Sequence, residues 1–129
     1  MLDLSKIDVL DECVVELLHP IKGTQVGASV TLLGPDHPVR RKISTARQTK
    51  IRNELKRTGK IQFGDPETDL QDEIAELADC VIGWTGIAEE GKEVKYTKEN
   101  AQRIFANVRW LREQVSAELN NKENFIKDL

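Results

Sequence analysis

The spacing of the hydrophobic residues changes at Gly34, and this change constrains the fold more than any other feature of the chain. Before Gly34, residues 24–33 alternate apolar with polar or small side chains, which is the period of a half-buried strand. Residues 13–18 are rich in β-branched and apolar side chains, and a turn sequence separates the two segments. We therefore predict a β-hairpin that pairs Cys13–Leu18 with Thr24–Leu33. An isolated hairpin is only marginally stable in water, so other elements must cover its apolar face.

After Gly34 the apolar residues fall at helical spacing. The first helical segment begins at Asp36, a potential N-cap, and Pro38, which suits a first turn, and it ends at Thr58-Gly59. Its apolar stripe is narrow and flanked by basic residues, which predicts a helix on the surface with one thin seam inward. The stripe consists of Val39, Ile43, Ala46, Ile51 and Leu55.

Two further helical segments follow. One begins at Asp65-Pro66 and is expected to end at Gly83. The other begins at Thr97, a good N-cap, and is expected to continue as one helix to about Asn120. The first of the two has the stripe Leu70, Ile74, Leu77, Ala78 and Val81, and the second has the heptad-like core positions Ala101, Ile104, Val108, Leu111 and Val115.

These patterns predict an α+β fold, predominantly α-helical, with an N-terminal β-hairpin followed by about three helices packed as a small bundle. The 129 residues suffice for a single domain with one core. A hydrophobic content of 39% and a charged content of 32% predict a thin core and a strongly solvated surface. We divide the domain into a hairpin region (1–34), a helical region (36–120) and a flexible tail (121–129), because the end of the chain is polar.

Charge is distributed unevenly along the chain. Residues 40–60 contain nine basic residues and one acidic residue, a local charge of +8, although the whole chain has a net charge of only −3. Residues 65–79 contain seven acidic residues and no basic residue. Adjacent segments of opposite charge either neutralise each other within one molecule or pair head to tail between copies, so we expect a homo-oligomer.

No pattern typical of a catalytic or ligand-binding site occurs. Phosphate-binding, dinucleotide-binding, zinc-protease and EF-hand motifs are absent from the sequence. His19 and His37 each adjoin a proline and are interpreted as turn residues, and Cys13 and Cys80 as small buried side chains. The acidic run is interpreted as a solvated helix face. We assign no catalytic, cofactor-binding or metal-ligating residue, and we expect a protein that is not an enzyme and has no cofactor.

The sequence also bears on location. No run approaches the 18 apolar residues typical of a membrane span, and the N-terminus does not resemble a signal peptide. We therefore expect a protein of the cytoplasm without a membrane partner.

The candidate residues are protein-interaction residues. Lysines and arginines clustered on one helix are typical of nucleic-acid binding, but pairing with an acidic protein surface explains them equally well. The absence of interleaved aromatic residues makes nucleic acid the weaker interpretation. Trp84 is expected in the core, whereas Trp110 either widens the core or is an exposed anchor for a partner. The candidates are Arg40, Arg41, Arg47, Lys50, Trp84 and Trp110.

Several short segments resemble a known family. They are the stretch 82–87 (Ile-Gly-Trp-Thr-Gly-Ile), the turn 89–91 (Glu-Glu-Gly), the helix entry 94–100 (Val-Lys-Tyr-Thr-Lys-Glu-Asn) and Asn124-Phe125. These segments resemble the C-terminal region of tail assembly chaperones of long-tailed bacteriophages. The segment from Glu16 to Asp36 is similar to the N-terminal region of these chaperones, whereas 40–60 shows no such similarity.

The resemblance implies a non-enzymatic helper of the host cytoplasm that coats the tape measure protein, keeps it soluble and brings tail tube subunits to it. Such a helper leaves before the virion is complete, and its gene often also makes a longer frameshifted product. Two alternatives remain open. One is a structural head–tail or tail component of the virion, and the other is a small nucleic-acid-binding phage regulator.

Overall fold

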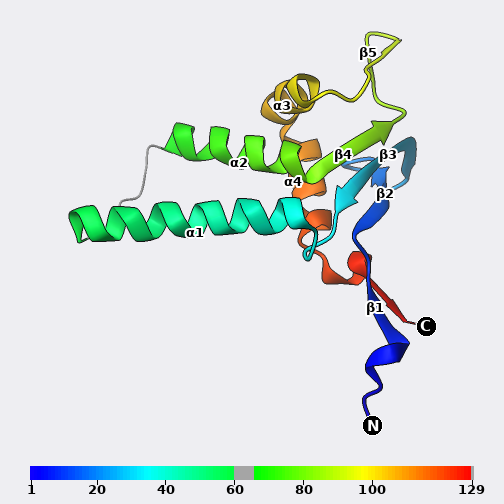
Figure 1. Cartoon of the computed structure of the whole chain (residues 1–129). Helices are drawn as coiled ribbons and strands as arrows, with labels where there is room; N and C mark the ends of the chain where they lie inside the picture. The colour runs from blue at the N-terminus through cyan, green and yellow to red at the C-terminus, as the bar shows by residue number, and fades with distance from the viewer. Residues whose placement is uncertain (60–65, 129) are drawn as a thin grey trace.

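The computed structural model describes residues 1–59 and 66–128 (Figure 1). The fold is mixed α+β and about half helical, with antiparallel N-terminal strands, as the sequence predicts. The elements are η1 (Leu4–Lys6), β1 (Ile7–Val9), β2 (Glu12–Leu18), β3 (Gln25–Leu33), α1 (Pro38–Thr58), α2 (Pro66–Cys80), β4 (Val81–Thr85), β5 (Ala88–Glu89), β6 (Lys92–Glu93), α3 (Lys98–Asn107), α4 (Arg109–Leu119), η2 (Lys122–Phe125) and β7 (Ile126–Asp128).

The predicted hairpin is confirmed, and it belongs to a three-stranded antiparallel sheet of order β2-β3-β4. Val15 of β2 pairs with Val30 of β3. Along β3 the inward side chains of Ala28, Val30 and Leu32 are buried, as the alternation predicts. Val26, at the start of the same pattern, is 44% exposed, so the core covers only the second half of the strand.

The third strand, β4, does not follow from the sequence pattern. The prediction that the helix starting at Asp65-Pro66 continues through Val81 to Gly83 is wrong, because α2 ends at Cys80 and the chain enters a strand at once. Trp84 pairs with Val30 on the central strand. A register shift between β3 and β4 lets both Val81 and Trp84, three residues apart, be buried. Pairing with β3 therefore decided the conformation of this segment.

Helix α1 is a surface helix, as predicted, and none of its residues is buried. Its N-cap is His37 and not Asp36: the Nδ1 atom of His37 accepts a hydrogen bond from the backbone N–H of Val39 (3.1 Å). Pro38 occupies the first turn, which places the residue before it at the cap. Gly59 ends the helix in the left-handed conformation (φ +68°), as expected.

Helix α2 packs only its C-terminal half into the core. Ile74, Leu77 and Ala78 are buried, as predicted. Leu70, one turn earlier, is 38% exposed, although the helical stripe includes it. The N-terminal half of α2 extends past the sheet beside α1 (Figure 1), which leaves Leu70 beyond the core. Asp65 lies outside the described residues.

The single helix expected from Thr97 to about Asn120 is divided into α3 and α4. Thr97 caps α3, as predicted, and its side chain accepts a backbone N–H (3.0 Å). At Val108 the backbone leaves the helical region (φ −116°, ψ 87°). The guanidinium of Arg112 donates a hydrogen bond to the carbonyl oxygen of Phe105 (2.7 Å), which supports the chain at the break. The change of direction lets both helices bury their apolar residues.

The end of the chain has regular structure, whereas the sequence predicts a flexible tail over 121–129. Phe125 is 1% exposed and belongs to the core, and the backbone N–H of Leu10 donates to its carbonyl oxygen (2.7 Å). The Asn124 side chain donates to the carbonyl oxygen (2.9 Å) and to the carboxylate (2.7 Å) of Glu118. Strand β7 then pairs with β1 in a two-stranded ribbon near both chain ends (Figure 1). Contacts far apart in sequence explain the difference.

One hydrophobic cluster holds the sheet, α2, α3 and α4 together. Trp84 contacts Tyr96 and Phe105 edge to face, with ring centroids 5.1 Å and 6.3 Å apart. The Trp84 indole N–H donates to the Val94 carbonyl oxygen (2.8 Å), which satisfies its polar group.

Gly34 lies so close to the backbone of Leu10 that a Cβ atom there would be 2.1 Å from a carbonyl oxygen. The residue at the boundary between strand and helix must therefore be glycine.

Candidate protein-interaction surfaces

Helices α1 and α2 run side by side away from the sheet (Figure 1), and we call the pair the arm. At the base of α1, Ile43 packs against the core in a half-buried position. Farther along α1, Ile51 and Leu55 are 43% and 47% exposed. Thus none of the 21 residues of α1 is buried, although the base of the helix touches the core.

The two helices of the arm are joined mainly by charge. The Arg47 guanidinium pairs with the Glu76 carboxylate, and the Lys50 ammonium lies 3.9 Å from the Asp72 carboxylate. The basic segment and the acidic segment therefore neutralise each other in part within one molecule, one of the two possibilities that the sequence leaves open. Because Arg47, Lys50 and Asp72 are largely exposed, each pair stabilises the fold by at most about 1 kcal/mol.

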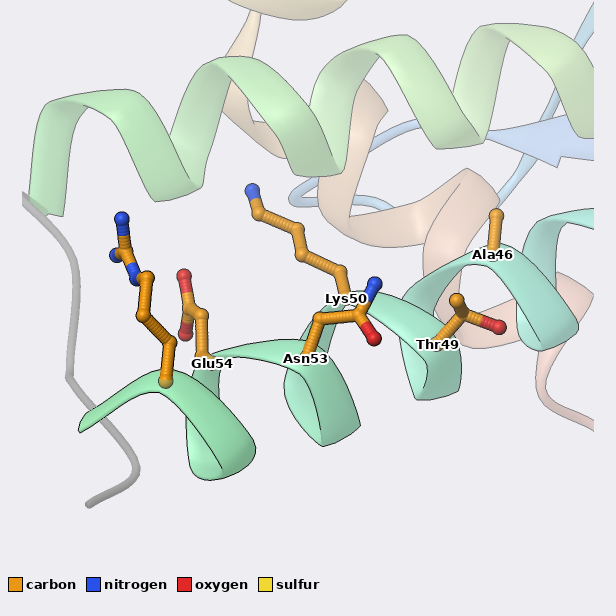
Figure 2. A pocket seen from close by; sticks show the side chains of 6 residues that line it. Ala46, Thr49, Lys50, Asn53 and Glu54 are labelled. Carbon is orange, nitrogen blue, oxygen red and sulfur yellow. The ribbon is translucent and has the colours of Figure 1, made fainter. Parts of the chain in front are cut away.

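A groove of about 1060 Å³ separates the helices of the arm and reaches the end of α4. Its α1 wall is mainly basic and its α2 wall is acidic. A second, open hollow of about 590 Å³ is lined by α1 residues alone, and Figure 2 shows Lys50 and Glu54 of its lining reaching from α1 toward α2. The groove is lined at its apolar floor by Ile43, Leu77, Cys80 and Leu119, and along its charged walls by Arg40, Arg47, Lys50, Glu54, Asp69, Asp72, Glu73, Glu76 and Asp79.

The four basic candidate residues occupy different environments. Arg40 is half-buried: its guanidinium donates to the carbonyl oxygens of Leu33 (3.2 Å) and Leu119 (3.5 Å) and lies 6.0 Å from the ring centroid of Phe125. It anchors the base of α1. Arg41 is exposed and 3.8 Å from Asp36, whereas Arg47 and Lys50 bridge the arm. The sequence places these four residues together but does not separate the anchor from the surface charges.

The two tryptophans also differ. Trp84 is 9% exposed and belongs to the core, in agreement with its expected position. Trp110, on α4, is 40% exposed. Large aromatic side chains at the surface often contribute much of the energy of a protein interface. Trp110 is therefore the candidate anchor for a partner, and Trp84 is a structural residue.

Three aliphatic residues of the arm are exposed although their spacing predicts that they face inward. They are Ile51, Leu55 and Leu70, which fit a helical stripe and were therefore expected to face inward. One feature of the sequence could have indicated this exposure: the apolar stripe is narrow and flanked by charged residues. Such a stripe is as typical of an interface as of the edge of a core.

Three groups near the core, the thiols of Cys13 and Cys80 and the hydroxyl of Tyr96, have raised pKa values. Burial raises the pKa of both the Cys80 and the Cys13 thiols, which keeps them protonated at neutral pH and weakly nucleophilic. Both are free cysteines. Burial also raises the pKa of Tyr96, whose hydroxyl donates toward the carbonyl oxygens of Ala78 (3.0 Å) and Val81. These groups support the packing between α2, β4 and α3.

Both histidines hold turns, as interpreted from the sequence. The Nδ1 atom of His19 accepts from the backbone N–H groups of Ile21 (3.2 Å) and Lys22 (3.1 Å), and that of His37 caps α1. Over residues 1–59 and 66–128, the side chains of His, Cys, Asp and Glu form no group of three or more that could hold a metal ion. None of the helices in those same ranges has the length and hydrophobicity needed to cross a lipid bilayer.

A comparison with known protein families identifies the family to which this chain belongs. A model of the YdaY prophage protein family matches residues 38–128, which include the whole arm, β4, α3, α4 and β7. The chain belongs to the YdaY prophage protein family. A search of curated proteins and a search of solved structures found no match.

The YdaY match includes the segment 40–60, which the resemblance to tail assembly chaperones leaves out. It starts at the first residue of α1 and leaves β1, β2 and β3 outside. The arm is therefore part of the YdaY unit. This membership establishes the phage origin of the chain.

Proposed function

We propose that this YdaY protein is a phage tail assembly chaperone. In this role it binds the tape measure protein in the host cytoplasm, keeps it soluble, helps to recruit tail tube subunits and is absent from the mature virion. It acts by protein binding alone and is not an enzyme. Membership of a prophage family and the resemblance at 82–87, 94–100 and Asn124-Phe125 support this role.

The structural observation that carries the proposal is α1, a 21-residue helix without a single buried residue. Isolated helices are at best marginally stable in water, and in proteins most of the stability of a helix comes from packing. A helix left uncovered by its own core is suited to packing on another protein. The groove beside it is wide, open and crossed by ion pairs, and this suits a protein surface better than a small molecule.

Trp110 is the best candidate for contact with the tape measure protein. It is a large aromatic side chain, 40% exposed, on a helix whose other face is packed in the core. Its truncation should remove binding area without removing a core contact. Trp84 provides the contrast, since the same truncation there would empty part of the core.

Coexpression with the tape measure protein of the same prophage tests the role. The native chain should keep the tape measure protein in the soluble fraction and copurify with it. Trp110→Ala should lower the copurified amount about tenfold or more, because interface tryptophans often contribute 2 kcal/mol or more. Lys122→Ala, an exposed substitution on η2, is the matched surface control and should leave copurification unchanged.

Circular dichroism of the Trp110→Ala chain must match that of the native chain, so that loss of binding is separated from unfolding. A tape measure protein that is equally insoluble with and without the native chain would disprove the proposal. Finding the chain in stoichiometric amount in purified tailed particles would instead favour a structural component of the virion.

The basic surface of α1 favours one second candidate, a nucleic-acid-binding regulator. Arg41, Lys42, Arg52 and Lys56 are exposed along this helix. The acidic α2 lies beside them, however, and would repel phosphates. A mobility shift with duplex DNA at about 0.15 M salt separates the two: a shift that fades steeply with salt would support the regulator.

A further inference from the structure

The charges and the exposed aliphatic residues of the arm suit a symmetric interface between two copies of the chain. We propose that a second copy of this chain covers it, with the basic α1 of each copy lying along the acidic α2 of the other. The inference goes beyond the proposed function, because it requires only this chain: the second copy covers the arm, and Trp110 on α4, which is not part of the arm, is left for the tape measure protein.

Charge complementarity is the first argument. Helix α1 has eight basic residues and one acidic residue, and α2 has six acidic residues and no basic residue. A two-fold axis places each helix against its opposite in the other copy, so a single contact type is formed twice. Two arms facing each other in this way attract at both contacts.

Many of these charges form no salt bridge with another described residue of the same molecule. In the part of the chain that the structure describes, two salt bridges join α1 to α2, and they use Arg47, Lys50, Asp72 and Glu76. Within the same residues, no salt bridge is formed by Lys42, Arg52, Lys56 or Arg57 of α1, or by Asp69 or Glu73 of α2. Unpaired charges of both signs therefore remain on one arm.

The exposed aliphatic side chains supply the apolar part of the interface. Ile51 and Leu55 on α1 and Leu70 on α2 are 43%, 47% and 38% exposed, and each lies on the arm beyond the core. A dimer would bring six such side chains together. Apolar contacts among flanking charge pairs are the arrangement that stabilises paired helices in bundles.

The size of the arm is adequate. The 21-residue α1 is about 31 Å long and the 15-residue α2 about 22 Å, so at a width of about 10 Å each they present roughly 530 Å² in outline. The accessible area of such an uneven face is larger than its outline. It thus approaches the roughly 800 Å² per partner that a standard protein interface buries.

A foreign helix inside the groove is a poorer occupant than a second copy. The Arg47–Glu76 and Lys50–Asp72 pairs cross the groove, and an inserted helix would have to break both. A second copy uses the charges that are still unpaired and leaves these two pairs intact.

Two charge-reversed variants test the inference. One has Arg52→Glu with Lys56→Glu on α1, and the other has Asp69→Lys with Glu73→Lys on α2. Sedimentation equilibrium should show that the native chain dimerises and that each variant alone dimerises about tenfold or more weakly, since like charges then face each other twice. An equimolar mixture of the two variants should recover a heterodimer, because both of its contacts again join opposite charges.

The matched control is Lys22→Glu with Lys122→Glu, which changes the net charge as much as the α1 variant does, at exposed positions off the arm. It should dimerise like the native chain. Raising salt from about 0.15 M to about 1 M should weaken the native dimer, because the screening length falls from about 8 Å to about 3 Å. A monomeric native chain, variants that dimerise normally, or a mixture that recovers nothing would each overturn the inference.

Discussion

Helix α1 of the arm and helices α3 and α4 differ in how many of their residues are buried. We call the part of the molecule outside the arm the body, and α3 and α4 belong to it. Helix α1 is 21 residues long and buries none of them, whereas α3 and α4, with 10 and 11 residues, bury three each. All three carry many charged residues. The difference is that α3 and α4 repeat large aliphatic or aromatic residues on one side, and α1 spaces its few aliphatic residues among arginines and lysines. A continuous apolar face, and not the length of the helix, therefore determines whether a helix packs in the core.

The largest expected effect contrasts the body with the arm directly. Phe105 is fully buried against Trp84, so Phe105→Ala should lower the free energy of unfolding by about 3–5 kcal/mol. Leu55→Ala on α1 should lower it by about 0.5 kcal/mol or less at concentrations where the chain is monomeric. Urea unfolding followed by circular dichroism measures both. Similar losses from the two variants would mean that the arm is packed as tightly as the body.

The junction between the two regions comes next. Arg40→Ala removes the hydrogen bonds to the Leu33 and Leu119 carbonyl oxygens and the contact with the Phe125 ring. We expect a loss of about 2 kcal/mol, because hydrogen bonds from charged groups to buried acceptors are among the stronger ones. Hydrogen exchange should show faster exchange along α1. The neighbouring Arg41→Ala, at an exposed position, should change neither quantity, and an equal effect at both positions would contradict the anchor role.

A smaller effect is expected within the arm. Arg47→Ala breaks the ion pair with Glu76 and should cost at most about 1 kcal/mol, because Arg47 is largely exposed. The loss should vanish near 1 M salt, where the native pair is itself screened. Comparing the unfolding of the native and variant chains at low and high salt measures this. A loss that persists at high salt would show that the Arg47 side chain packs through its apolar stem as well.

The smallest effect concerns an ion pair of the body that lies at its surface. Two hydrogen bonds from Arg103 (3.0 and 2.6 Å) lower the pKa of Glu89 from its ordinary value of 4.5. A depressed carboxyl pKa contributes stability above the ordinary pKa, and this contribution is lost as the pH falls through the lowered value. Carbon-13 NMR of the Glu89 carboxyl should show a midpoint below 4.5. Arg103→Gln should return that midpoint to the ordinary range, and an unchanged midpoint would exclude this cause.

Much of the secondary structure could be predicted, because local rules act on adjacent residues. Alternation identified β2 and β3, Thr97 identified the start of α3, and Gly59 the end of α1. The interpretation of α1 as a surface helix also follows from its own sequence. Of the candidate residues, the basic side chains were found as a group, since charge is a property of composition.

Tertiary structure decided what depends on contacts between distant residues. Val81–Thr85 is a strand because β3 offers it a partner, Val108 breaks a helix so that α3 and α4 both reach the core, and Phe125 is buried because the core has room for it. The tertiary structure also distinguishes Arg40, which anchors α1, from the surface charges of the arm. In the same way it distinguishes the buried Trp84 from the exposed Trp110. Periodicity and charge can be recognised from neighbouring residues. Burial depends on how all segments of the chain pack together, so no single segment determines it.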